Sequence, residues 1–279
     1  MKRHRWGRLA IAVSVVALLA TACGGGKNDS SSSSSGSNTL RVGSDIAYPP
    51  VEFYKEGTKD VQGIDYDLCQ AVAKEMGKSG CTFQNVTFDG LIPALKTKRF
   101  DAIFSAMSDT AKRQEEITFV DYFTVGTSII VKKGNPEGIK GLDDLCGRTI
   151  GVQRGTTQET VSNAQKVKCQ AAGKDLTVLT FDTDVDAQQA LRAGRSVADM
   201  NDFPVAAYVA QQAGDFEVVG EQIEAGPYGV GIRKDDTALR DQIQTALKAV
   251  IASGEYDRIL AKWNVSQGAL KTAAVNGGS

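Results

Sequence analysis

Two stretches of the chain share one order of secondary-structure elements, and this order restricts the fold more than any other feature. Residues 39–107 read as strand, helix, strand, helix and strand, and residues 148–202 read the same way. Short apolar runs such as "TLRVGSD" and "FDAIFSAM" are typical of buried strands, whereas "GIDYDLCQAVAKEMG" has apolar residues at helical spacing. The order predicts an α/β fold in which two similar lobes contain mixed, mostly parallel sheets.

The loops that follow the strands are where a ligand is expected, because open parallel sheets bind ligands beyond the C-terminal ends of their strands. These loops are "SDIAYPPVEF", "SAMSDTAKR", "RGTTQE" and "MNDFP". Three of the helices that follow loops are expected to begin at capping side chains. Asp89 would cap "DGLIPALKTKR", Thr110 would cap the helix that contains Arg113, and Thr156 or Thr157 would cap the helix after Gly155.

The first 22 residues have the pattern of a signal peptide, and residues 23–38 that of a tether. Basic residues precede the apolar run "LAIAVSVVALLA", which is too short to span a bilayer. Small residues in "ATAC" precede Cys23, which favours a lipoprotein whose Cys23 is acylated, although an ordinary secretory signal is the alternative. The Gly- and Ser-rich stretch that follows is typical of a flexible linker. We therefore expect a protein anchored by lipid to the outer face of the cell membrane.

The composition excludes several functions. Cleavage before Cys23 would leave 28 basic and 33 acidic residues and no basic cluster, so nucleic acid is not an expected partner. The only histidine, His4, lies in the predicted signal, and no CxxC spacing occurs, so neither a metal nor a cofactor is expected. Four further cysteines suggest two disulfides in an exported protein, and pairing of neighbours gives Cys69–Cys81 and Cys146–Cys169.

Arg113 is expected to lie where a helix dipole disfavours a positive charge. If Thr110 is an N-cap, Arg113 lies in the first helical turn, where a cation opposes the helix dipole at a cost of about 0.3–1 kcal/mol. A carboxylate bound by the guanidinium and by the first helical N–H groups would reverse that cost. The alternative is a surface arginine paired with Glu115, Glu116 or another acidic neighbour.

The other loops offer complementary groups. The helix that begins near Thr156 and Thr157 could bind an anion or be merely capped. Asp202 could hold an ammonium group or serve only as an N-cap, and Tyr48 and Phe88 could flank a side chain or belong to the core. Together, an arginine, an aspartate and aromatic rings suit a free α-amino acid.

Several ordered motifs resemble the polar amino-acid-binding proteins of bacterial ABC importers, solute-binding protein family 3. The stretch from about residue 39 to 265 is similar to histidine- and lysine/arginine/ornithine-binding proteins. The segments that carry the likeness are "GSDIAYPPVEF", "GIDYDL", "LIPALKTKRFDA", "SAMSDTAKR" and "GTTQE".

The resemblance implies a periplasmic-binding-protein-like (type II) fold that closes on its ligand about a two-strand hinge. Lobe 1 would comprise residues 39–126 and 227–279, and lobe 2 residues 127–226. Arg113 and Ser108 would bind the α-carboxylate, Asp202 and the Ala106 carbonyl the ammonium group, and Asp45 a cationic side chain. The full set of expected ligand-binding residues is Asp45, Tyr48, Phe88, Ser105, Ala106, Ser108, Arg113, Thr156, Thr157 and Asp202.

The function implied is capture of a polar L-amino acid by a monomer, without catalysis, and its delivery to the permease of an ABC importer. Asp45, Asp109 and the paired rings favour a basic side chain, whereas Arg154 beside Gly155 would favour an acidic one. A cyclohexadienyl dehydratase-like enzyme on the same fold is a second hypothesis, and an amino-acid sensor is a third. The enzyme would need an acid or base over its substrate.

Overall fold

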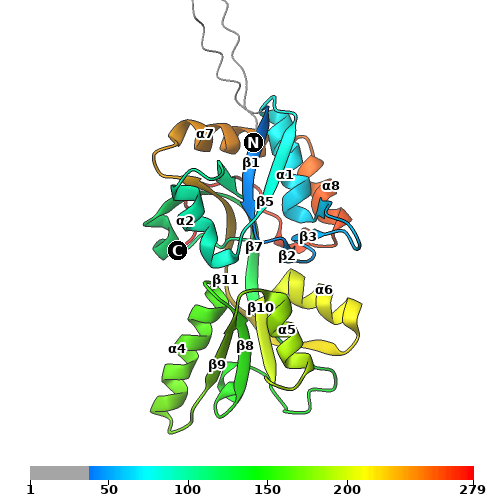
Figure 1. The fold of residues 1–279 in the computed structure, drawn as a ribbon, viewed down its shortest axis with the longest axis vertical. Helices are drawn as coiled ribbons and strands as arrows, with labels where there is room; N and C mark the ends of the chain where they lie inside the picture. Colours follow the sequence, from blue (N-terminus) through cyan, green and yellow to red (C-terminus); the bar gives the residue numbers. More distant parts are fainter. Residues whose placement is uncertain (1–37) are drawn as a thin grey trace, which may run out of the picture. The chain divides into compact units, whose positions relative to one another are not determined.

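A computed structural model describes residues 38–279. The predicted signal peptide, Cys23 and all but the last residue of the predicted tether lie outside the described residues. The α/β class is confirmed, and a single eight-stranded sheet runs through both lobes (Figure 1). The strand order is β5 (Gly80–Asn85), β1 (Thr39–Ser44), β6 (Ala102–Ile103), β11 (Phe216–Arg233), β7 (Ile117–Lys132), β10 (Ala198–Asp202), β8 (Thr149–Gln153) and β9 (Thr177–Phe181).

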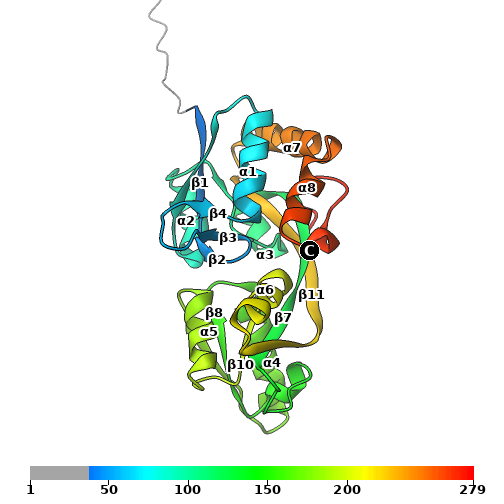
Figure 2. The ribbon, with the colours of Figure 1, turned by 90° about the vertical axis from the view of Figure 1, so that its right-hand side faces the viewer.

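The two ends of this sheet form the two lobes. In lobe 1, β1 pairs in parallel with β5 and β6, and in lobe 2, β8 pairs in parallel with β9 and β10. The long strands β7 and β11 are antiparallel to each other and run from one lobe into the other (Figure 2). Their pairing has register shifts between Val219 and Gly226 and again at Tyr228, in the passage between the lobes. These two strands are the predicted hinge.

Helices cover the sheet in both lobes. Lobe 1 carries α1 (Ile64–Glu75), α2 (Leu91–Lys96), α3 (Ala111–Gln114), α7 (Thr237–Ala252) and α8 (Glu255–Lys262). Lobe 2 carries α4 (Thr157–Ala171), α5 (Asp184–Arg192) and α6 (Phe203–Ala213). A small sheet of β2 (Ala47–Tyr48), β3 (Glu52–Tyr54) and β4 (Val61–Gln62) precedes α1. Among residues 38–279, no helix combines the length and the apolar character needed to cross a membrane.

Short 3₁₀ turns complete the described elements. They lie at η1 (Phe88–Gly90), η2 (Leu142–Leu145) and η3 (Ser266–Gly268). The first of these explains why Asp89 is not the helix cap that its position suggested. The chain enters α2 through the turn η1, so Asp89 lies inside a turn and caps neither element with its side chain. The prediction of an Asp89 cap is therefore wrong.

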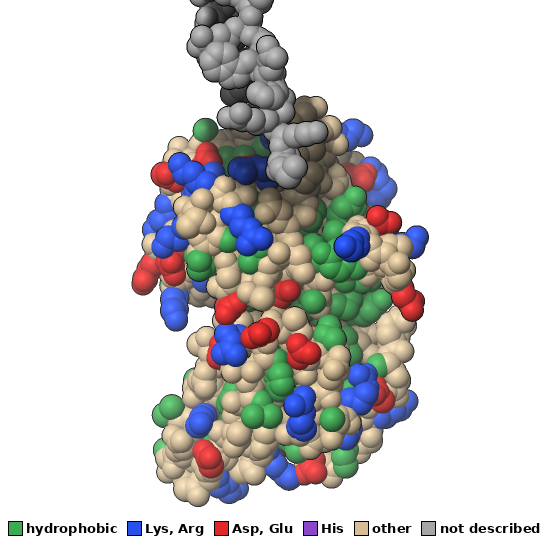
Figure 3. Space-filling view, in the orientation of Figure 1, with side chains coloured by type: hydrophobic (Ala, Val, Ile, Leu, Met, Phe, Trp, Pro, Cys, Tyr) green, Lys and Arg blue, Asp and Glu red, His purple; other side chains and the backbone are tan. Residues whose placement is uncertain are grey.

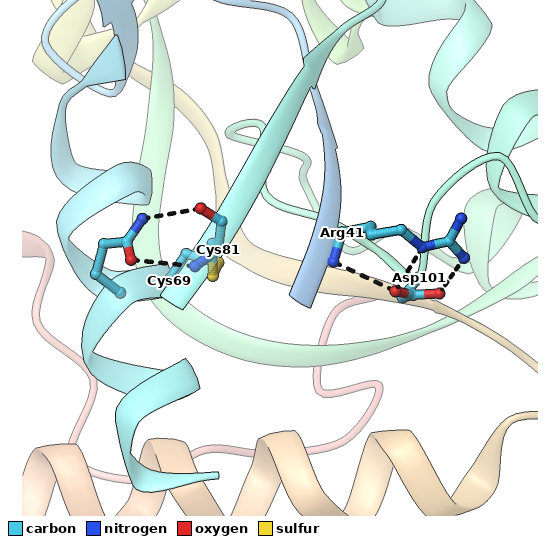
Figure 4. The surroundings of a disulfide bond; sticks show 5 residues. Arg41, Cys69, Cys81 and Asp101 are labelled. Carbon is cyan, nitrogen blue, oxygen red and sulfur yellow. Dashed lines mark hydrogen bonds and ion pairs between the residues drawn. A yellow bond between two sulfur atoms is a disulfide. The ribbon is translucent and has the colours of Figure 1, made fainter. Parts of the chain in front are cut away.

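Both disulfides suggested by the cysteine count are present in the structure. Cys69–Cys81 joins α1 to β5, and the side chain of Gln70 bonds the backbone of Cys81 beside it (Figure 4). Cys146–Cys169 joins the segment after η2 to the last turn of α4. One cross-link therefore lies in each lobe.

Candidate ligand-binding site

A pocket with about 300 Å³ of empty space is lined by residues of both lobes. In the space-filling view, the outline is indented at the level where the lobes meet, and acidic side chains gather there (Figure 3). Nine of the ten expected ligand-binding residues line this pocket, namely Asp45, Tyr48, Phe88, Ala106, Ser108, Arg113, Thr156, Thr157 and Asp202.

Ser105, the tenth expected residue, lies behind the pocket wall. It is fully buried, its hydroxyl accepts a hydrogen bond from the Asp45 N–H at 2.9 Å, and it donates one to Glu52 Oε1 at 3.1 Å. Ser105 therefore supports two pocket-lining acids and does not line the pocket itself.

Arg113 reaches across from lobe 1 to lobe 2. Its guanidinium donates to the carbonyl of Ser108 at 2.7 Å and to that of Gly155 at 3.0 Å, and it lies 5.3 Å from the centre of the Phe88 ring. Glu115 and Glu116 make no ion pair with Arg113 in the described structure, and Glu116 pairs with Lys96. The surface-pair explanation of Arg113 is thus wrong. Removal from water lowers the pKa of Arg113 to about 10, so it remains a cation at neutral pH.

Two capped helix N-termini lie near the guanidinium, and that of α4 lines the pocket. Thr110 caps α3 by accepting from the Arg113 N–H at 3.3 Å, and Thr156 caps α4 by accepting from the Glu159 N–H at 3.1 Å. Thr157, the first residue of α4, lines the pocket. The positive end of α4 therefore points at the pocket from the lobe opposite Arg113, an arrangement that favours an anion.

Asp202 is an N-cap by position, but its side chain makes no cap hydrogen bond to α6. Instead, Oδ1 accepts from Gln158 Nε2 at 2.8 Å and Oδ2 accepts from the Tyr48 hydroxyl at 3.1 Å. Burial raises the pKa of Asp202 to about 6. The carboxylate therefore faces the pocket, where a cation would offset the cost of its burial.

Asp45 and Glu52 add two more carboxyl groups to the pocket. Asp45 Oδ2 accepts from Gln153 Nε2, and burial raises the pKa of Asp45 to about 6. Glu52 is 1% exposed, and burial, followed by the nearby Asp65 carboxylate, raises its pKa well above its usual range. Within residues 38–279, Glu52 Oε2 has no hydrogen-bond partner although it is buried. An unpaired buried acceptor of this kind suits a ligand that donates.

Three pocket residues were missed from the sequence: Glu52, Gln153 and Gln158. Glu52 and Gln158 lie inside the quoted motifs "GSDIAYPPVEF" and "GTTQE", and Gln153 ends the strand before "RGTTQE". The motifs contained the signal for the first two. Gln153 could have been found only from its place at the C-terminal end of a predicted strand.

Arg154 and Asp109, which left the charge of the preferred ligand side chain undecided, do not line the pocket. Arg154 pairs with Asp182 at 3.5 Å and does not line the pocket. Asp109 bonds Gln114 and Gly278 away from the pocket. Among the described residues that line the pocket, the charged ones are therefore one base, Arg113, and three acids, Asp45, Glu52 and Asp202.

The backbone at Ala106 is held in a left-handed conformation, with φ of 46°. Its N–H donates to Asp65 Oδ2 at 2.9 Å, and Asp65 Oδ1 accepts from the Tyr122 hydroxyl at 2.7 Å. Strained backbone that persists under such buried bonds is typical of binding sites. Asp65 and Tyr122 thus fix the peptide that lines the pocket between Ser105 and Ser108.

The sequence from residue 40 to 266 matches the model of the bacterial extracellular solute-binding proteins, family 3. The chain belongs to this family. The lysine/arginine/ornithine-binding periplasmic protein of Escherichia coli K12 is 35% identical over 234 residues, which are 81% of this chain and 87% of that protein. An arginine-binding protein of Corynebacterium glutamicum is 31% identical over 240 residues, which are 85% of this chain and 78% of that protein.

Solved structures of similar amino-acid-binding proteins confirm the two-lobed fold. An ancestral arginine-binding protein bound to arginine superimposes with a TM-score of 0.75 at 37% identity, over 81% of this chain and 98% of that one. An ancestral amino-acid-binding protein described as a precursor of cyclohexadienyl dehydratase gives a TM-score of 0.73 at 37% identity, over 81% and 95% of the two chains. These relatives are binding proteins, and the last of them is related to an enzyme.

Proposed function

We propose that this family member captures a basic L-amino acid outside the cytoplasm and delivers it to the permease of an ABC importer. The observation that carries the proposal is the charge of the pocket, one guanidinium against three carboxyl groups. A basic amino acid has one anionic and two cationic groups, so among the amino acids its charges come nearest to this excess of acids in the pocket. The similar proteins named for lysine, arginine, ornithine and histidine support this choice.

The α-carboxylate would bind at the Arg113 end of the pocket. There the guanidinium, Ser108 and the N-terminus of α4 at Thr157 converge. Arginine binds a carboxylate through two parallel N–H donors, which lysine cannot reproduce. The α-ammonium would bind Asp202, assisted by the carbonyl of Ala106.

The side chain would extend between Tyr48 and Phe88 toward Asp45 and Glu52. The unpaired Oε2 of Glu52 and the Asp45 carboxylate would accept from its cationic end. Closure is expected to follow ligand binding, because residues of both lobes contact the ligand only when the lobes are together. We place lobe 1 at residues 39–126 and 227–279 and lobe 2 at residues 127–226.

Titration calorimetry tests the proposal directly. L-arginine, L-lysine, L-ornithine and L-histidine are expected to bind with micromolar affinity or better, about −8 kcal/mol, and L-glutamate much more weakly. Arg113→Ala should weaken binding by about 2–5 kcal/mol, because the carboxylate would be buried without its partner. Arg240→Ala, at a surface pair with Asp241 on α7, is the matched control. Wild-type affinity in Arg113→Ala would refute the site assignment.

We further propose that the mature chain is a monomer anchored by an acylated Cys23, with residues 23–38 as the tether. The family is extracytoplasmic, and the apolar run before Cys23 supports export. Metabolic labelling with an alkyne fatty acid should mark the wild type but not Cys23→Ser. Light scattering of the acyl-free chain would give the mass of one copy, and a dimer mass would contradict the proposal.

We propose binding without catalysis, and the relative that preceded cyclohexadienyl dehydratase makes the alternative testable. A dehydratase needs an acid or base placed over its substrate, and Glu52 is a buried acid of the pocket with a raised pKa. Incubation with prephenate or arogenate is expected to give no product. Formation of phenylpyruvate or phenylalanine would establish the enzyme instead, and binding of many amino acids without any importer partner would favour the sensor.

A further inference from the structure

After α8 the chain runs back beside β7 toward α3, which carries Arg113. Phe123 forms an isolated bridge with Ala269, and Val120 forms one with Val275. We call residues 274–278 the strap. The Asp121 N–H donates to the Ala274 carbonyl at 2.9 Å, and the Phe119 N–H donates to Asn276 Oδ1 at 2.8 Å. The strap is therefore fixed to β7 by hydrogen bonds of the backbone and of one asparagine.

The end of the strap binds the Arg113 loop. The Gly278 N–H donates to Asp109 Oδ2 at 2.9 Å, and Gln114 Nε2 donates both to Asp109 Oδ1 at 2.8 Å and to the Gly278 carbonyl at 3.0 Å. Gln114 follows Arg113 directly in α3, and Asp109 directly precedes the cap residue Thr110. Both ends of the short helix that positions the guanidinium are thus tied to Gly278.

The strap approaches so closely that only glycine fits. A Cβ on Gly278 would lie 2.0 Å from the carbonyl oxygen of Asp109, and a Cβ on Gly277 would lie 2.5 Å from Asp121 Oδ2. Both neighbours belong to well-anchored elements, since the Asp109 N–H donates to the Pro227 carbonyl of β11 and Asp121 lies in β7. A side chain at Gly278 would therefore displace the strap, because it would meet backbone atoms of Asp109.

The strap also donates to two neighbouring acids, Asp121 and Asp109. The Gly277 N–H donates to Asp121 Oδ2 at 3.0 Å, and the Gly278 N–H serves Asp109. Burial, and then the charge of Asp109, raise the pKa of Asp121 to about 7. Without the two strap amides, each of these acids would lose one hydrogen-bond donor.

We infer that the strap is a positioning element for Arg113: by holding Asp109 and Gln114, it sets the guanidinium in place to bind the α-carboxylate of the ligand. This inference rests on the proposed amino-acid binding. A general loss of stability would weaken the binding of every ligand, whereas a misplaced Arg113 would weaken only the binding of ligands that have an α-carboxylate. Only the part of the affinity that comes from the α-carboxylate should depend on the strap.

The test compares two ligands, L-arginine and L-argininamide, which has no carboxylate but keeps both cationic groups. Calorimetry on Gly278→Ala should show about a tenfold or greater loss of affinity for L-arginine, a loss that corresponds to a hydrogen bond to a charged group, and little change for L-argininamide. The ratio of the affinity for L-arginine to the affinity for L-argininamide should fall accordingly. Gly141→Ala is the control, because Gly141 has extended backbone and a Cβ added there would meet nothing within 4 Å.

An unchanged ratio in Gly278→Ala, or an equal loss for both ligands, would overturn the inference. If Gly278→Ala does not fold by circular dichroism, Gln114→Met decides the question. This variant keeps the length of the side chain but removes its bonds to Asp109 and Gly278, and the same fall in the ratio is expected. Failure of the wild type to bind L-arginine would instead refute the proposed function itself.

Discussion

Tyr48 and Asp202 are joined by two hydrogen bonds, although 154 residues separate them in the sequence. The Tyr48 hydroxyl donates to Asp202 Oδ2 at 3.1 Å and accepts from the Asp202 N–H at 2.9 Å. Tyr48 lies in β2 of lobe 1, and Asp202 ends β10 of lobe 2. One phenol therefore links the lobes beside the residue proposed to bind the ligand ammonium.

Tyr48→Phe should weaken ligand binding through closure. The variant leaves the buried Asp202 N–H without its acceptor when the lobes meet, at a cost of about 1–3 kcal/mol. The affinity for L-arginine should fall by about tenfold or more in calorimetry, while the melting temperature without ligand changes little. Tyr54→Phe, at an exposed position in β3, is the control. An unchanged affinity would show that the two bonds do not contribute to closure.

Glu52→Gln should change the preference for the side chain. The substitution keeps the shape but removes the one pocket acid whose Oε2 lacks a partner among the described residues. The affinity for L-arginine should fall by about 1.5–3 kcal/mol, whereas that for neutral L-glutamine should hold or rise. Calorimetry with both ligands measures the change, with Glu221→Gln at an exposed position as the control. Equal losses for both ligands would argue against a role in charge selection.

Binding should weaken as the pH falls through about 6. Burial raises the pKa of Asp45 and of Asp202 to about 6, compared with about 3.9 for a free aspartate. A cationic ligand favours the ionised form, so binding below this pH must release protons. The affinity for L-arginine should fall below about pH 6 by up to about tenfold per pH unit for each of the two aspartates that must ionise.

Calorimetry in buffers of different ionisation enthalpy measures these protons. Asp202→Asn should bind more weakly at neutral pH but with a shallower dependence on pH, since one of the two titrating acids is gone. An affinity for L-arginine that rises toward acidic pH would contradict the assignment of both carboxylates to cationic groups of the ligand.

Phe53→Ala should speed the release of the ligand. The Phe53 ring in lobe 1 lies 6.2 Å from the ring of Tyr208 in lobe 2 and 5.9 Å from that of Trp263. Aromatic pairs contribute about 0.5–1.5 kcal/mol, so dissociation of L-arginine should be about 2–10-fold faster. Stopped-flow fluorescence can follow it, because Trp263 is the only tryptophan besides Trp6 of the predicted signal. Phe83→Ala, which removes a contact with Tyr66 inside lobe 1, should leave the rate unchanged.

The strands and helices could be predicted because their apolar residues form short runs in the strands and recur at helical spacing in the helices. β1, β8 and α1 lie where the apolar runs and helical spacing placed them, within a few residues. The sequence could not decide whether Asp202 caps a helix or binds the ligand, since a carboxylate before Phe203 and Pro204 suits either role. Only the contacts with Tyr48 and Gln158 decide in favour of the pocket.

Contacts between segments that are far apart in the chain could not be predicted from the sequence. Gln153 faces Asp45 only because β8 and β1 end at the same pocket, and no local pattern marks such a pair. The strap has no periodicity, and its two glycines resemble any flexible end until Asp109 and Asp121 are seen against them. Nor did the sequence show that the turn η1 would remove Asp89 from its capping position.

The paths of β7 and β11 have a consequence for the order in which the chain can fold. Strands β8, β9 and β10 lie within residues 149–202, so this half of the sheet can form from neighbouring parts of the chain. The pairing of β1 with β5 and β6 is similarly local, but β6 also pairs with Gly231 and Ile232 of β11, more than a hundred residues later. Contacts so far apart in sequence form slowly. Strand β6, though made early, should therefore acquire its second neighbour, β11, late.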